Sequence, residues 1–187
     1  MTFLKNSPKI LETDKIRLEP FSAKYLTDRY IAWLNDPVVC RDNRHGREEY
    51  TREKAQAYWE RVQKDKSHQM FAVLMKPPLE HVGNISLSSI STDNASAQIA
   101  VLIGEKTAWG HGIGFEACRL LLDYGFSVLN LHRIWMGMTA RNTAMIRIAE
   151  KLGMKQEGCF KDAFRKDGTY LDIVQFARLN SFQENGS

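Results

Sequence analysis

The feature that most constrains this chain is an apolar segment that leads through a glycine-rich loop directly into a helical pattern. Residues 97–103 are nearly all apolar, and glycines alternate through residues 110–114. From residue 113 to 129 apolar side chains recur at steps of three and four, and residues 133–138 form another strand-like segment. Strand, helix and strand in this order predict a βαβ unit, with parallel strands and a right-handed crossover.

The loop in this unit lacks a side chain that could cap the helix. The first N–H groups of a helix have no intrahelical partner, and a Ser, Thr, Asp or Asn side chain usually accepts from one of them. No residue from 110 to 115 is of that kind, and Gly110, Gly112 and Gly114 allow positive φ and a close approach of a ligand to the backbone. The loop therefore predicts a cradle for an anionic group such as phosphate. A tight turn without a ligand is the alternative, because the spacing matches neither G-x-G-x-x-G nor a Walker loop.

Composition and charge limit the functions open to the chain. Its 187 residues, 43% of them apolar, suffice for one domain with a substantial core. It has no apolar run near the ~18 residues of a membrane span and no signal-peptide pattern, so we expect a cytoplasmic protein without membrane contact. The three cysteines lie far apart, so neither a disulfide framework nor a metal site is expected. Acidic residues interrupt the basic segment 41–47, and no nucleic-acid partner is expected.

The remaining pattern predicts an α/β (α+β) fold in a single domain over residues 13–180, with loose termini at 1–12 and 181–187. Before the βαβ unit we expect a strand at 15–20, helices at 25–34 and 51–62, and strands at 70–75 and 82–90. After it, Asn142 should cap a helix that ends before Gly153, and Asp167–Gly168 should join strands 155–165 and 169–179 in a hairpin. The predicted order is β-α-α-β-β-β-α-β-α-β-β, in a mostly antiparallel sheet with one parallel pair.

Three blocks of residues in this pattern resemble the GNAT superfamily of N-acetyltransferases. They are Trp-Gly-His-Gly-Ile-Gly-Phe-Glu-Ala at 109–117, Leu-His-Arg-Ile at 131–134, and Arg-Asn-Thr-Ala followed by Glu-Lys-Leu-Gly-Met within 141–154. Together they look most like the Rim-type branch, named for ribosomal-protein-alanine acetyltransferases, and the resemblance covers residues 13–180. It implies the transfer of an acetyl group from acetyl-CoA to an amine acceptor, and it suggests a homodimer.

The resemblance also implies which residues hold acetyl-CoA. In the family motif Gln/Arg-x-x-Gly-x-Gly/Ala, Trp109 takes the first position here, and binding should survive because backbone N–H groups hold the phosphates. Asn142 matches a residue that bonds the cofactor near its thiol, with a plain helix cap as its second role. Arg147 and His111 are candidates for phosphate contacts, with an ordinary surface position as the alternative. The full expected set is Val101, Leu102 and Ile103, whose backbone would pair with the pantetheine arm, and Trp109, Gly110, His111, Gly112, Ile113, Gly114, Asn142 and Arg147.

Two positions depart from the family's catalytic pattern. Gln98 stands where the family often carries a glutamate base, and Ala149 where many members carry a tyrosine acid. The reaction still needs a neutral amine, hydrogen-bond donors for the oxyanion and a proton for the leaving thiolate. We hypothesise that Glu105, which follows the cofactor strand, is the base.

Other groups could serve these needs. Asp172, His45 or water alone are alternatives for deprotonation, and the backbone N–H of Leu102 or Ile103 is the candidate oxyanion donor. A CoA-binding module without catalysis is a further interpretation, raised by the same two departures.

The acceptor stays open at this point. The Rim-type resemblance implies a protein N-terminal α-amine, while segments 33–37 and 83–87 also look like relatives that acetylate nucleotide-linked amino sugars. Polyamines and aminoglycosides are further options. We expect the polar loop 36–50 to cover the acceptor site, and its arginines would suit an anionic acceptor.

Overall fold

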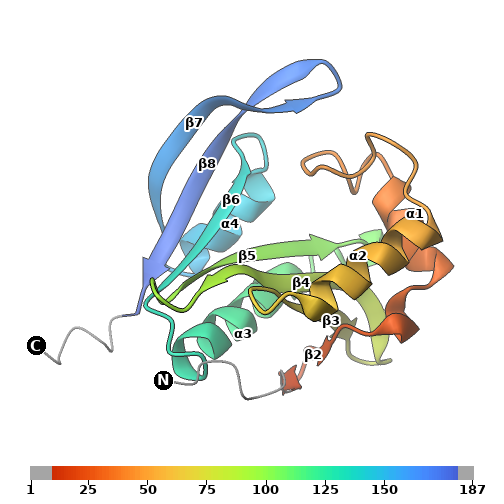
Figure 1. Ribbon diagram of the computed structural model, residues 1–187, viewed down its shortest axis with the longest axis horizontal. Coiled ribbons are helices and arrows are strands. Elements are labelled where there is room, and N and C mark those ends of the chain that lie inside the picture. The colour runs from red at the N-terminus through yellow and green to blue at the C-terminus, as the bar shows by residue number, and fades with distance from the viewer. Residues whose placement is uncertain (1–9, 181–187) are drawn as a thin grey trace, which may run out of the picture.

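One eight-stranded sheet runs through residues 10–180, which are the residues that the computed structural model describes (Figure 1). The strands lie in the order β1-β2-β3-β4-β5-β6-β8-β7. Their bounds are Leu11–Glu12 (β1), Ile16–Pro20 (β2), Gln69–Met75 (β3), Glu80–Ser91 (β4), Ser96–Ile103 (β5), Arg133–Thr139 (β6), Lys155–Lys166 (β7) and Thr169–Leu179 (β8). The helices are α1 (Asp28–Asn35), α2 (Arg52–Lys64), α3 (Ile113–Ser127) and α4 (Thr143–Lys151), with short 3-10 turns η1 (Ala23–Tyr25) and η2 (Lys106–Ala108). The element order and the mixed sheet predicted from the sequence are confirmed.

Strands β5 and β6 are the two strands of the predicted βαβ unit. Among residues 10–180 they form the one parallel pair of the sheet, with α3 as the crossover. Their register joins Ser96 to Arg133 and ends where Gln98 meets Trp135. Beyond that point β6, β8 and β7 turn away from β5, as Figure 1 shows. The sheet therefore opens between the carboxyl-terminal halves of the two parallel strands, which is where ligands of such sheets bind.

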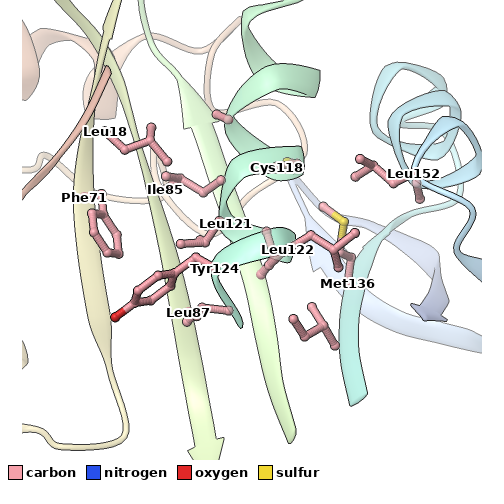
Figure 2. Packing of buried hydrophobic residues seen from close by; sticks show 14 of the residues in the cluster. Leu18, Phe71, Ile85, Leu87, Cys118, Leu121, Leu122, Tyr124, Met136 and Leu152 are labelled. Atoms are coloured by element: carbon pink, nitrogen blue, oxygen red, sulfur yellow. The ribbon is translucent and has the colours of Figure 1, made fainter. Parts of the chain in front are cut away.

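Helices cover both faces of the sheet. Helices α3 and α4 bury the larger apolar cluster on one face, and η1, α1 and α2 bury a smaller one on the other. Figure 2 shows Leu121, Leu122 and Tyr124 of α3 pointing toward the side chains of the central strands. Burial of this apolar surface is the main source of stability, and it explains why the inner strands are apolar on both faces.

Two turn predictions are confirmed by the backbone. Asp167 and Gly168 both have positive φ, 48° and 81°, as the first and second central residues of a type I′ hairpin turn require. Gly153 follows the last turn of α4 with a φ of 70°.

Two predicted boundaries are wrong. The helix expected from residue 25 begins only at Asp28, because Thr27 is its N-cap and accepts from the N–H of Tyr30 at 3.2 Å. The terminus expected to be loose up to residue 12 includes Leu11–Glu12, which pair with β2. The rest of the predicted loose termini, 1–9 and 181–187, lies outside the described residues.

His81 lies in the smaller apolar cluster and makes its stability depend on pH. The ring packs against those of Tyr25 and Trp33 at 4.7 and 5.1 Å, and its Nε2 is buried without a hydrogen-bond partner. Burial lowers the pKa of His81 from 6.5 to about 4. Between these values the unfolded chain binds a proton that the folded chain does not, so stability falls as the pH drops from about 6.5 to 4 and then levels off.

We therefore expect His81→Phe to remove part of the acid sensitivity of the fold. Relative to this variant, the wild-type protein should lose about 2–3 kcal/mol of unfolding free energy across that window. Urea unfolding of both proteins at several pH values measures the difference. Parallel pH curves for the two proteins would show that the protonated imidazole is tolerated where it lies.

Candidate active site

The start of α3 presents backbone donors that nothing in the described chain occupies. Gly112 is the N-cap in the left-handed conformation, with a φ of 79°, and no side chain caps the helix. The N–H groups of Ile113, Gly114 and Phe115 have no acceptor among residues 10–180. A Cβ added at Gly112 would meet no atom within 4 Å, so the space in front of these donors is open. Free donors, the helix dipole and open space fit a phosphate group.

Trp109 ties this loop to the end of β5. Its indole Nε1 donates to the carbonyl of Ile103 at 2.8 Å, although the side chain is 42% exposed. The tryptophan that departs from the family motif thus fixes the loop through its own hydrogen bond. His111 lies in the same turn with an exposed side chain and no hydrogen bond to residues 10–180.

The free edge of β5 offers backbone groups next to this loop. Gly104 donates its N–H to Val82 of β4, and Ile103 turns its carbonyl away from β4 to Trp109. In an antiparallel pair, the backbone N–H and C=O groups of successive residues point alternately toward the partner strand and away from it. The backbone groups of Val101 therefore also point away from β4, toward the side on which β6 no longer pairs with β5. The N–H of Leu102, one of the two expected oxyanion donors, points to β4 instead. The prediction that it could bind the oxyanion is therefore wrong. The N–H of Ile103 stays a candidate.

Two small residues form the floor of the opening. Ala100 of β5 and Gly137 of β6 are exposed, although both belong to inner strands of the sheet. Their neighbours Ile99 and Met136 point into the larger cluster, so these two positions face the side of α1 and α2. The free edge of β5 is therefore reachable from that face.

The loop 36–50 reaches across this opening and is attached on its far side. Asp42 accepts from Thr139 Oγ1 at 2.9 Å and from Arg141 Nε at 2.7 Å, and Arg141 also donates to the carbonyl of Arg41. Thr139 is 1% exposed, so its hydroxyl depends on this bond. Burial alone would raise the pKa of Asp42, but the bonds from Arg141, Thr139 and Arg41 outweigh it and lower the pKa.

The same loop also contacts the tip of the β7–β8 hairpin. Lys166, which is buried, donates to the carbonyl of His45 at 2.5 Å. Arg47 donates to the carbonyl of Arg165, and its guanidinium lies 5.1 Å from the ring centre of Phe164. Figure 1 shows the loop and the hairpin tip approaching each other above the splayed strands. The loop therefore lies over the opening, and its role as a cover of the acceptor site stays a prediction.

The carboxylates proposed as bases are held by other groups. Glu105 accepts from Arg29 Nη2 at 2.6 Å and from Thr107 Oγ1 at 3.1 Å, and the Arg29 bond lowers the pKa of Glu105. Asp172 accepts from Lys161 at 2.7 Å, which lowers its pKa as well. Both look like structural ion pairs, and a catalytic role for either stays a prediction.

His45 differs from these carboxylates. Its partial burial, with Lys166 nearby, lowers the pKa of His45. The imidazole is therefore neutral at neutral pH.

The remaining expected residues have simple positions on α4. Asn142 caps the helix, with Oδ1 accepting from the N–H of Met145 at 3.2 Å, so its capping role is confirmed. Arg147 is exposed and pairs with no residue between 10 and 180. Ala149 is fully buried, so a side chain there packs in the core.

A sheet that opens between two parallel strands beside an uncapped helix start fits a protein that holds an extended, phosphate-bearing cosubstrate. The family model "Acetyltransferase (GNAT) domain" matches residues 15–155. The chain belongs to this family of acyltransferases, whose cosubstrate is acetyl-CoA.

Two bacterial relatives carry names of the same kind. The chain is 32% identical over 109 residues to "Uncharacterized N-acetyltransferase p20" of Bacillus licheniformis, a match that covers 58% of this chain and 61% of that one. It is 32% identical over 133 residues to "Probable N-acetyltransferase YjcK" of Bacillus subtilis (strain 168), over 71% of this chain and 73% of that one. The chain thus spans less than two thirds of the first relative.

Two solved structures share the fold. A spermidine N-acetyltransferase from Vibrio cholerae in complex with CoA and spermine has a TM-score of 0.81, with 22% identity over 90% of this chain and 98% of that one. The ribosomal L7/L12 alpha-N-protein acetyltransferase RimL in complex with coenzyme A has a TM-score of 0.83, with 17% identity over 91% and 98%. At these identities the likeness concerns the fold alone.

Other features of the described chain add no second site. A hollow between η1 and α2, lined in part by Leu26, Arg52 and Glu60, lies on the face opposite α3. Residues 10–180 contain no cluster of three metal-ligating side chains. Within the same range, no helix combines the length and the hydropathy that crossing a membrane requires.

Proposed function

We propose that this chain is an N-acetyltransferase that moves the acetyl group of acetyl-CoA to a primary amine by direct attack in a ternary complex. The observation that carries the proposal is the opening between β5 and β6, with free backbone donors beside it at the start of α3. The residues fit the cosubstrate, because its diphosphate needs N–H donors and its pantetheine arm needs an unpaired strand edge.

Each part of the opening then has a role in binding or catalysis. The N–H groups of residues 113–115 hold phosphate, and the backbone of Val101 and Ile103 holds the pantetheine arm. Bound acetyl-CoA supplies an activated acetyl thioester. The N–H of Ile103 can stabilise negative charge on the reacting carbonyl oxygen. The loop 36–50 confines the amine above Ala100 and Gly137.

The charges of the loop favour an acceptor that carries negative charge. Asp36, Asp42 and Glu48 each have an ion-pair partner, whereas Arg44 and Arg47 have no carboxylate partner among residues 10–180. Glu49 is the one loop acid without such a partner in that range, so the unpaired charge is net positive. An acidic peptide N-terminus or a nucleotide-linked amino sugar fits this charge.

A polyamine is the second candidate acceptor. The fold shared with the Vibrio cholerae spermidine acetyltransferase supports it. The unpaired arginines weigh against it, because they would repel a polycation.

Release of free thiol from acetyl-CoA, measured across an acceptor panel, tests the proposal. The panel holds acidic and neutral N-terminal peptides, nucleotide-linked amino sugars, polyamines and aminoglycosides. We expect turnover with an anionic acceptor and little with polyamines. Thermal stabilisation by CoA without turnover on any amine would instead support a binding module without catalysis.

Glu105→Gln tests the base that the sequence suggested. Because Arg29 and Thr107 already occupy the carboxylate, we expect the variant to keep kcat/KM within about threefold and to keep the shape of its pH profile. A loss of the alkaline-rising limb in this variant would identify Glu105 as the base after all.

A further inference from the structure

Trp135 is a large aromatic side chain that lies outside both apolar clusters of the described chain. It belongs to the inner strand β6, and its neighbours Ile134 and Met136 point into the larger cluster around α3. Because side chains alternate along a strand, Trp135 faces the other side of the sheet, where it is only partly buried. Part of its ring is therefore available to a ligand.

The ring lies at the point where β5 and β6 separate. Trp135 pairs with Gln98 in the last register pair before the opening. A Cβ added at the exposed Gly137 would lie 3.7 Å from Cζ3 of the indole, so the ring leans along β6 toward the floor of the opening. The helix α3 packs on the opposite face. A cosubstrate held at the start of α3 and an acceptor resting on Trp135 would thus approach the opening from opposite faces of the sheet.

Two glutamines flank the indole on the same face. Gln98 is its register partner on β5, and Gln175 of β8 pairs with Gly137. Both side chains are partly buried, and neither makes a hydrogen bond to any residue from 10 to 180. Each amide offers two N–H donors and one carbonyl acceptor, whereas a hydroxyl group both donates and accepts. A flat apolar ring between two such amides fits a molecule with an apolar face and several hydroxyl groups.

We propose that Trp135 is a platform for a sugar ring of the acceptor, and that Gln98 and Gln175 bind its hydroxyl groups; this inference rests on the proposed function. The C–H face of the sugar packs on the indole, which directs its primary amine toward the free edge of β5. The loop arginines without a carboxylate partner in the described chain, Arg44 and Arg47, supply positive charge for a diphosphate. The acceptor is therefore a nucleotide-linked amino sugar.

The other acceptor classes fit this surface less well. A polyamine carries several ammonium groups, and β5, β6 and β8 present no carboxylate to them on the face of Trp135. The loop arginines would repel the same groups. A peptide usually binds by pairing its backbone with a strand edge, and the free edge of β5 is already taken by the pantetheine arm in the proposed function.

Calorimetric binding to the CoA-saturated protein tests the platform without the need for turnover. The probes are uridine diphosphate glucosamine, uridine diphosphate, which lacks the sugar, and an acidic tripeptide with a free N-terminus. Trp135→Phe keeps a flat aromatic face, and Trp135→Leu keeps an apolar side chain without one. Phe160→Leu is the matched control, because it removes an exposed ring on the same face of the outer strand β7.

We expect Trp135→Leu to raise the Kd of uridine diphosphate glucosamine about tenfold relative to Trp135→Phe. Gln98→Met and Gln175→Met should each raise it about fivefold, because each loses hydrogen bonds to the sugar. The Kd of uridine diphosphate and the Kd of CoA should stay within about twofold in every variant. Phe160→Leu should match wild type, and the tripeptide should bind wild type more weakly than the sugar nucleotide does.

Three results would overturn the inference. They are equal Kd values of the sugar nucleotide for the Phe and Leu variants, tighter binding of the tripeptide than of the sugar nucleotide, and no measurable binding of the sugar nucleotide to the CoA-saturated wild type. The failure of the proposed function looks different: the sugar nucleotide then binds with the expected dependence on Trp135, but no amine releases thiol from acetyl-CoA.

Discussion

Gly112→Asp is expected to raise the Kd for CoA about 100-fold, or about 2.7 kcal/mol, without unfolding the protein. Gly112 has a φ of 79°, a conformation that Asp and Asn tolerate better than other residues. A carboxylate at this point faces the space where the diphosphate would lie, and two charges about 4 Å apart repel by about 1–4 kcal/mol in a partly screened site.

Gly112→Asn is the matched control for this charge. Its side chain has nearly the same size but is neutral, so we expect less than about a tenfold loss of affinity. The difference between the two variants should shrink as salt rises, because ions screen the repulsion. Gly168→Asp, in the hairpin turn with a φ of 81°, controls for backbone strain alone. Equal Kd values for the Asp and Asn variants would mean that no anion binds at the start of α3.

Asp42→Ala is expected to lower both the stability of the fold and the rate of acetyl transfer to the amine. The change leaves the buried hydroxyl of Thr139 and the guanidinium of Arg141 without their shared partner, which should cost about 2 kcal/mol of unfolding free energy. Because the loop 36–50 then loses its attachment beside α4, kcat/KM for the amine should fall about tenfold, while the Kd for CoA stays within about threefold.

Two further variants separate the contributions of Asp42. Asp42→Asn keeps an oxygen for Thr139 and should recover about half of the lost stability. Arg41→Ala removes an exposed ion pair and should cost less than about 1 kcal/mol. Since the folded chain holds the pKa of Asp42 below its usual value, the stabilisation is present at neutral pH and is lost as the pH falls below about 4. An Asp42→Ala protein that loses CoA binding as strongly as amine turnover would contradict a role confined to the acceptor side.

The parts of the site that could be predicted from the sequence are those built from neighbours in the chain. The uncapped start of α3 and the parallel pair follow from residues within 97–138, because glycine spacing and apolar periodicity are local signals. The beginning of α1 was also readable, since Thr27 followed by an acidic residue is a capping signal that the apolar spacing alone overlooked.

The attachment of the acceptor loop could not be predicted in this way. Asp42 is 97 residues from Thr139 and 99 from Arg141, and none of the three has a local pattern that marks its partner. The bond from Arg29 to Glu105 was equally hidden, because Arg29 lies 76 residues earlier in the chain. Which residues distant in the sequence become partners depends on how the sheet folds. The spacing of residues along the chain carries no information about that.

Hydrogen exchange of backbone amides with and without CoA tests the central claim most directly. CoA should slow exchange at residues 113–115 and at Val101 and Ile103, the amides that residues 10–180 leave without a partner at the start of α3 and beside the splayed strands. The amides of α2 around Arg52 should not change. Protection confined to the hollow between η1 and α2, with none at α3 or β5, would contradict the account.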